Sequence, residues 1–255
     1  MTLFVRSFGT GPDVVLLHGW GFHGGVWDEL AETLAGWGRR VHVVDLPGHG
    51  HSPVPVTPLE VDGLAEAVRA TVPVGAAWVG WSLGGMVALA AAIRYPDEVS
   101  ALVLIGASPC FVRGPDWPAA VAPELLSEFG RGLTEDWRAT LQRFLALQAR
   151  AVAGQIVRCL RTSMFALPPN PAALAAGLTV LQETDLRSRL SAVICPTLVL
   201  LGERDTLVPA AVAADLARLR PDWRIRCLSG AGHLPFLTHR AEVLSALTEH
   251  LDGLR

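Results

Sequence analysis

The sequence contains no lysine, and all 21 of its basic residues are arginine. Without lysine the protein cannot form a Schiff base with a substrate carbonyl or with pyridoxal phosphate, and it has no P-loop lysine for a nucleotide. Cysteines are few and scattered, with no C-x-x-C pair and no metal-ligand spacing, at Cys110, Cys159, Cys195 and Cys227. We expect them to be reduced core residues. We expect no metal and no organic cofactor.

A basic excess and a long apolar run are also missing. The formal net charge of -3 argues against a general nucleic-acid binder. The strongly apolar residues 83–93 are too few to cross a membrane, and the first residues lack the basic segment of a signal peptide. We therefore expect a cytoplasmic protein that acts as a monomer, without membrane or nucleic-acid contact.

Strand-like and helix-like segments alternate along much of the chain. With 255 residues, 51% of them hydrophobic, the chain can bury one large core. Alternation of this kind indicates a mostly parallel sheet with helices on both faces, an α/β fold. The expected strands are residues 3–8, 14–17, 41–44, 76–79, 101–105, 196–201 and 224–228, and the expected helices are 26–37, 59–72, 85–94, 210–219 and 240–251.

The alternation stops after Gly106. Residues 107–190 contain helical stretches and turns but no convincing strand, so we expect a helical lid inserted after the strand that ends near Ile105. The expected division is a first part of the core at 1–106, a lid at 107–190 and a second part of the core at 191–255.

Residues 80–84, Gly-Trp-Ser-Leu-Gly, have the pattern G-x-S-x-G between an expected strand and an expected helix. Glycine at positions 80 and 84 lets two backbone segments approach where a Cβ would crowd the turn. Ser82 must then take a strained conformation that presents its Oγ at the helix N-terminus, which is the geometry of a nucleophile. The alternative is a tight turn that merely contains a serine.

A serine nucleophile needs a general base, and the base needs an acid that fixes its tautomer. Catalytic groups in open α/β sheets gather at the carboxyl ends of strands, where Asp205 and His233 follow the last two expected strands. The chain order serine, acid, histidine also fits a G-x-S-x-G nucleophile. The alternatives are Asp45 or Glu203 as the acid and His49 or His51 as the base.

An oxyanion hole is also required, because the tetrahedral intermediate carries negative charge on the former carbonyl oxygen. We expect the backbone N–H groups of Leu83 and Trp20 to supply it. The Trp20 indole then either walls the substrate pocket or is merely packed under the lid.

Acidic residues are absent between Asp136 and Glu183, so this part of the lid carries +5 and the rest of the protein -8. Charge of one sign on a lid suggests an acidic partner that is steered to the site. The alternative is a solvated helix face whose arginines pair with acids elsewhere. The arginines concerned are Arg138, Arg143, Arg150, Arg158 and Arg161. Interleaved leucines and Phe144 suggest an apolar underside that accepts an acyl chain.

Taken together, residues 18–21, 45–52, 80–85, 202–205 and 230–233 make the sequence resemble the α/β-hydrolase superfamily over nearly its whole length. Within it, Gly-Trp-Ser-Leu-Gly-Gly, His-Gly-Trp-Gly and the lid segment 143–148 resemble the pimeloyl-[acyl-carrier protein] methyl ester esterases of biotin synthesis. The resemblance implies an acyl-carrier protein as partner. From their charge we expect the lid arginines to dock it. It also implies a set of substrate-binding residues, namely Trp20, Ser82, Leu83, Phe144, Leu145, Ala146, Leu147, Gln148 and His233.

We therefore expect a serine carboxyl-ester hydrolase. Its expected substrate is the methyl ester of a carrier-bound dicarboxylic acyl chain, which it hydrolyses to the free acid and methanol. One alternative is a carboxylesterase or carbon-carbon hydrolase acting on free small molecules, for which the lid arginines are incidental. Another is a hydrolase-like ligand receptor without turnover. Dehalogenase and epoxide-hydrolase chemistry on this fold needs an aspartate where this chain has Ser82.

Overall fold

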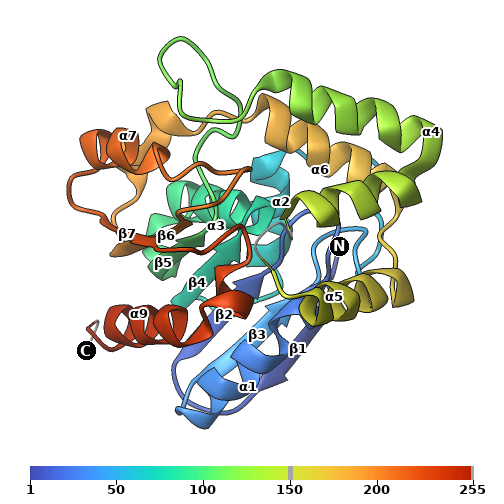
Figure 1. Ribbon diagram of the computed structural model, residues 1–255. Coiled ribbons are helices and arrows are strands. Elements are labelled where there is room, and N and C mark those ends of the chain that lie inside the picture. The colour runs from blue at the N-terminus through green and yellow to red at the C-terminus, as the bar shows by residue number, and fades with distance from the viewer. Residues whose placement is uncertain (149–151, 254–255) are drawn as a thin grey trace.

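A computed structural model describes residues 1–148 and 152–253. In this part of the chain, seven strands form one sheet in the order β1-β3-β2-β4-β5-β6-β7 (Figure 1). The strands are β1 Val5–Phe8, β2 Asp13–Leu17, β3 Arg40–Val44, β4 Ala76–Trp81, β5 Val99–Ile105, β6 Thr197–Gly202 and β7 Arg224–Leu228. Only β1 is antiparallel to its neighbour β3, and the other neighbouring pairs are parallel. The expected mostly parallel sheet is confirmed.

Helices cover both faces of this sheet, with α1 and α9 on one face and α2 and α3 on the other (Figure 1). The helices of the core are α1 Asp28–Gly36, α2 Val61–Arg69, α3 Leu83–Arg94, α7 Val212–Leu219, α8 Pro235–Thr238 and α9 Arg240–Asp252, with 3-10 turns η1 Gly24–Trp27, η2 Pro96–Glu98 and η3 Arg187–Ala192. Because both faces are covered, every residue of β4 and β6 is buried. This explains why these strands are continuous apolar runs in the sequence.

Three further helices lie between β5 and β6 and cover the end of the sheet at which the parallel strands finish (Figure 1). They are α4 Pro123–Gln148, α5 Gly154–Ala166 and α6 Pro171–Glu183. We call them the lid. Helix α4 is kinked at Asp136, whose φ of -151° and ψ of 94° are not helical. The Asp136 carboxylate accepts the Ala139 N–H at 3.0 Å and so caps the second half of the helix.

Most differences from the expected elements are shifts of one or two residues at their ends. Helix α3 begins at Leu83, two residues earlier than expected, directly after Ser82. The helix expected at 26–37 is divided into η1 and α1. The boundaries 1–106, 107–190 and 191–255 stay a prediction. In the described residues, no helix has the length and apolar character needed to cross a membrane.

Candidate active site

The turn between β4 and α3 holds Ser82 in a backbone conformation that few residues adopt. Its φ is 55°, and it is the only non-glycine residue with a positive φ in the described part of the chain. A Cβ on Gly80 would lie 2.3 Å from the carbonyl oxygen of Gly84, and one on Gly84 would lie 2.4 Å from that of Leu17. The turn therefore requires both glycines of the G-x-S-x-G pattern, and its tight packing holds Ser82 in the strained conformation.

Asp205 and His233 follow β6 and β7 and meet above the sheet. Nδ1 of His233 lies 2.7 Å from Oδ2 of Asp205, and both side chains are buried. The other carboxylate oxygen accepts the N–H groups of Leu207 at 2.8 Å and Val208 at 2.9 Å. These bonds orient the carboxylate so that Oδ2 can accept the Nδ1 proton, which leaves Nε2 with a free lone pair. Nε2 is buried and has no partner among the described residues.

Ser82 and His233 are brought together by the end of β5. The Ser82 N–H donates to the carbonyl of Ile105 at 3.0 Å. The next residue, Gly106, is so close to the histidine that a Cβ there would lie 3.2 Å from Nδ1 of His233. The Trp81 indole N–H also donates to the His233 carbonyl at 2.8 Å. The sequence interpretation missed Trp81 and Gly106, although Trp81 immediately precedes the nucleophile in a buried strand.

The loop after β2 brings Trp20 towards the nucleophile. A Cβ on Gly19 would lie 3.1 Å from the Cβ of Ser82. The buried His18 holds this loop, since Nδ1 faces the Gly19 carbonyl at 2.9 Å and Nε2 accepts the Leu46 N–H at 2.9 Å. Burial lowers the pKa of His18 to about 3, so the ring is neutral and Nε2 remains an acceptor.

Leu83 is the first residue of α3, so its N–H has no acceptor within the helix. Hydrogen bonds among the described residues do not occupy this group or the Trp20 N–H. Neither amide therefore has a backbone acceptor among the described residues. That they form the oxyanion hole stays a prediction.

The Trp20 indole connects this loop to the lid. Its N–H donates to the Leu174 carbonyl in α6 at 2.8 Å, and its ring packs edge-on against Phe144 in α4, with ring centroids 4.7 Å apart. The side chain is almost fully buried. In this structure the Trp20 side chain is therefore packed under the lid, which is one of the two alternatives for this residue.

The five lid residues expected to bind substrate do not share one face of α4. Phe144, Leu145 and Gln148 are buried, as the helical period predicts for positions i, i+1 and i+4. Both polar atoms of the Gln148 side chain are buried without a partner among the described residues. Ala146 is exposed, and it lines an outer groove with Leu147 and Arg143. Only the three buried residues face the interior.

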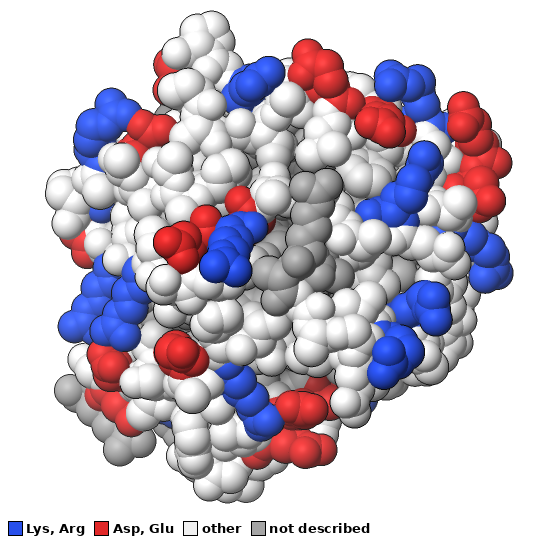
Figure 2. Space-filling view, viewed as in Figure 1, with Lys and Arg blue, Asp and Glu red and all other residues white. Residues whose placement is uncertain are grey.

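Four of the five lid arginines lie in the described residues, all of them exposed: Arg138, Arg143, Arg158 and Arg161. Arg150 lies outside the described residues. Within that part of the chain, the ion pairs belong to other arginines such as Arg6, Arg69 and Arg187. Figure 2 shows basic side chains over the region of α4 and α5, with acidic side chains beside them. Among the described residues, these four arginines therefore form no ion pairs with acids elsewhere in the fold, contrary to the alternative interpretation.

The rival acids and bases are engaged elsewhere. Asp45 accepts the N–H groups of Gly24 at 2.6 Å and His51 at 2.9 Å, so it organises two loops. Glu203 accepts the Gly230 N–H at 2.7 Å, and this bond is the main cause that lowers the pKa of its carboxyl. His49 is buried against the Pro47 carbonyl at 3.0 Å, and the His51 side chain is largely exposed.

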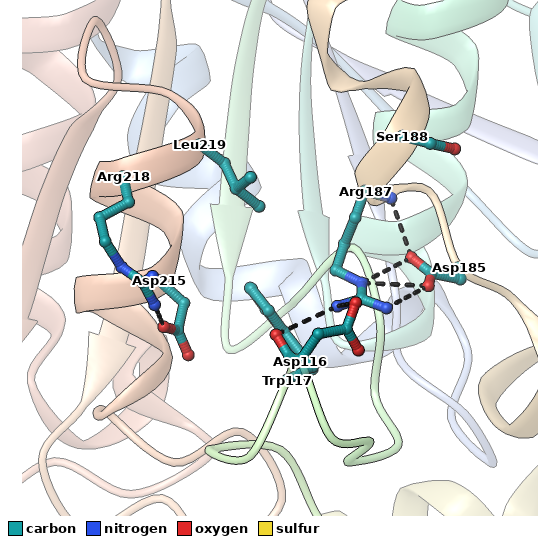
Figure 3. A pocket seen from close by; sticks show the side chains of 8 residues that line it. All are labelled: Asp116, Trp117, Asp185, Arg187, Ser188, Asp215, Arg218 and Leu219. Carbon is teal, nitrogen blue, oxygen red and sulfur yellow. Dashed lines mark hydrogen bonds and ion pairs between the residues drawn. The ribbon is translucent and has the colours of Figure 1, made fainter.

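A cleft of about 530 Å³ lies outside this site. Figure 3 shows the side chains that line it, namely Asp116, Trp117, Asp185, Arg187, Ser188, Asp215, Arg218 and Leu219. Arg187 pairs there with Asp185 at 2.6 Å and with Asp116 at 3.0 Å, and it lies over the Trp117 ring. The Asp185 bond is the main cause that raises the pKa of Arg187. These charges already satisfy one another, and no expected site residue lines the cleft. In the described residues, no three His, Cys, Asp or Glu side chains are grouped as a metal site requires.

Comparison with known proteins agrees with this geometry. Residues 12–240 match the family model described as the alpha/beta hydrolase fold, and the chain belongs to that family. A solved hydrolase from Pseudomonas aeruginosa superimposes with a TM-score of 0.84 at 28% identity, covering 98% of this chain and 94% of the other. An esterase from Exiguobacterium antarcticum, with a TM-score of 0.90 at 22% identity over 98% of this chain and 95% of its own, shares the fold.

Similarity to curated proteins is more specific. The chain is 47% identical to the pimeloyl-[acyl-carrier protein] methyl ester esterase of Xanthomonas campestris pv. campestris, over 99% of this chain and 100% of that protein. It is 41% identical to the Chromobacterium violaceum protein of the same name, over 99% of each chain. At this identity and coverage, the chain is a member of the same esterase family.

Proposed function

We propose that this protein is a serine ester hydrolase that uses Ser82, His233 and Asp205 as its catalytic triad. One observation carries the proposal: the buried bond between His233 and Asp205 leaves Nε2 without a partner among the described residues. The end of β5 contacts both this histidine and Ser82, which has a positive φ. A neutral imidazole in this state accepts a proton. The family similarity supports the same chemistry.

In this mechanism Ser82 Oγ attacks the ester carbonyl carbon while Nε2 of His233 takes its proton. Asp205 stabilises the imidazolium, and the Leu83 and Trp20 N–H groups bind the oxyanion. The C–O bond then breaks, and Nε2 returns the proton to the departing alkoxide, which leaves as the alcohol. Water attacks the acyl-enzyme by the same route and releases the acid and free Ser82.

The proposed substrate is the methyl ester of pimeloyl-[acyl-carrier protein], as in the similar proteins, which gives the carrier-bound acid and methanol and places the reaction in biotin synthesis. Leu141, Phe144 and Leu145 are buried in α4 and supply an apolar lid interior suited to an acyl chain. Arg138, Arg143, Arg158 and Arg161 are exposed and form no ion pair with another described residue, which suits an acidic carrier protein. Ser82 is 3% and His233 2% exposed, so the lid has to open before this substrate can bind.

The test compares kcat/KM for the carrier-bound methyl ester with kcat/KM for dimethyl pimelate, a free diester of the same acyl length, at low and high salt. We expect a large preference for the carrier that weakens as salt screens the arginines. Equal values that ignore salt would indicate a general esterase of small molecules. A serine-reactive phosphonate that failed to label Ser82 would instead revive the ligand receptor.

A cytoplasmic location and action as a monomer remain part of the proposal. Both rest on the sequence-based expectations.

A further inference from the structure

Several buried polar atoms have no partner among the described residues and no part in the proposed mechanism, and Nε2 of His49 is one of them. The ring is 2% exposed, and its Nδ1 faces the Pro47 carbonyl at 3.0 Å. A carbonyl oxygen can only accept, so the proton is on Nδ1 and Nε2 carries a lone pair. Burial lowers the pKa of this histidine to about 4, which keeps the ring neutral near pH 7. Nε2 finds no donor among the described residues, although a buried acceptor without a partner is costly.

His49 lines a small cavity of about 20 Å³. Its walls are formed by Leu46, Pro47, His49, Pro55, Leu59, Leu64, Leu83, Ala173, Ala176 and Gly177. His49 is the only member of this set with a polar side chain. A space of this size holds about one water-sized molecule. An occupant with an O–H group can donate to Nε2, and its remaining surface faces hydrocarbon.

The inner end of the cavity borders the active site. Leu83, whose N–H belongs to the proposed oxyanion hole, forms part of the wall. A Cβ on Gly177 would lie 3.2 Å from the Leu83 side chain and 2.9 Å from the Trp20 ring, so these three residues meet there. Leu83, which directly follows Ser82, thus belongs both to the cavity wall and to the start of α3.

The outer end of the cavity borders a groove of about 840 Å³ between α6 and the start of α2. Leu59 and Ala176 line both the groove and the cavity, and both are partly exposed. No residue of α4 or α5 lines the groove. It therefore opens away from the helices that carry the lid arginines.

We propose that this cavity and groove form a side passage for small hydroxylic molecules, with His49 Nε2 accepting their O–H group. Each turnover consumes one water and releases one methanol, and a carrier protein docked on α4 and α5 covers the opening used by the acyl chain. The inference rests on the proposed function in this respect. A passage lined by Leu59, Ala176 and Leu83 lets water enter and methanol leave while the carrier stays bound.

The test uses a substitution that narrows the space where the groove meets the cavity. In Ala176→Leu we expect kcat for the carrier-bound methyl ester to fall about fivefold, because the added carbons fill a space of one water. With dimethyl pimelate, which leaves the lid opening uncovered, kcat changes less than twofold. The matched control is Ala175→Leu, since Ala175 lines only the outer groove. Its kcat stays at the wild-type value with both substrates.

Rapid mixing separates the two molecules that use the passage. If the variant accumulates acyl-enzyme after a methanol burst, water entry is blocked. If acyl-enzyme does not accumulate and added methanol inhibits the variant more than wild type, methanol exit is blocked. Either result supports the passage.

The passage would be overturned if Ala176→Leu lowered kcat by the same factor for both substrates, or if it lowered kcat for neither substrate. Leu59→Trp narrows the facing wall and replaces Ala176→Leu if that variant does not fold. Failure of the proposed function looks different, because wild type itself would then not prefer the carrier-bound ester.

Discussion

Oδ2 of Asp205 lies 2.7 Å from Nδ1 of His233, while Oδ1 of the same carboxylate accepts two backbone N–H groups. Asp205→Asn keeps the shape but can present an N–H to Nδ1, which favours the wrong tautomer of the histidine. We expect kcat to fall about 10⁴-fold with little change in KM, as for a triad aspartate elsewhere. Ester hydrolysis by the purified variant measures this. The matched control Glu203→Gln alters the neighbouring acid, and its kcat should stay within about twofold of wild type.

Because Ser82 has a positive φ, two substitutions at this position should have the same effect on activity but different effects on stability. Ser82→Ala and Ser82→Gly both lose kcat by several orders of magnitude, because both lack the nucleophile. Glycine accepts a φ of 55° without strain and alanine does not, so we expect Ser82→Gly to be the more stable by about 1 kcal/mol. Urea unfolding of the two variants measures the difference. Equal stabilities would mean that the turn stores no strain at this residue.

Trp81 positions the base through its bond to the His233 carbonyl. Trp81→Phe keeps most of the ring but removes the N–H donor, and we expect kcat to fall about tenfold at unchanged KM. The control is Trp78→Phe in the same strand, because the Trp78 indole N–H has no partner among the described residues. A similar loss in both variants would point to packing of the strand instead of orientation of His233.

Burial of His18 and His49 makes stability depend on pH. Their folded-state pKa values of about 3 and about 4 lie below the ordinary 6.5, so the unfolded chain binds protons that the folded chain does not. The free energy of unfolding should therefore fall as pH drops below about 6.5, by up to about 1.4 kcal/mol per pH unit for each histidine, until about pH 4 for His49. Urea unfolding between pH 7 and pH 4 measures this slope.

His49→Gln should reduce that slope, since it removes one of the imidazoles whose pKa burial lowers. His51→Gln changes an exposed histidine of the same loop and should leave the slope as in wild type. An identical slope in His49→Gln would contradict the assignment.

We expect the lid arginines to affect hydrolysis of the carrier-bound ester but not hydrolysis of the free ester. Replacing Arg138, Arg143, Arg158 and Arg161 together by glutamine should lower kcat/KM for the carrier-bound ester about tenfold at low salt and flatten its salt dependence, while dimethyl pimelate is hydrolysed as before. Stopped-flow or steady-state assays at several ionic strengths measure both effects. Arg224→Gln, an exposed arginine on β7, is the control and should leave both substrates unaffected.

Local sequence patterns were enough to predict the alternation of strands and helices and the turn at Ser82. Apolar runs, helical periodicity and the glycines at 80 and 84 each act on neighbouring residues, so they can be interpreted without distant contacts. Other choices depend on which segments meet. Asp45 follows a strand as Asp205 does, but only the packing of β6 beside β7 puts Asp205 against His233.

Contacts between distant parts of the chain also decided where each lid residue points. The sequence by itself determined that residues 144–147 are apolar and that arginines lie nearby, but not that Ala146 faces solvent while Phe144 packs on Trp20. Likewise the bond from Trp20 to Leu174 joins residues 154 positions apart. The sequence determined the elements and the nucleophile because these depend on local conformation, whereas the partner of each buried polar atom was decided only by tertiary packing.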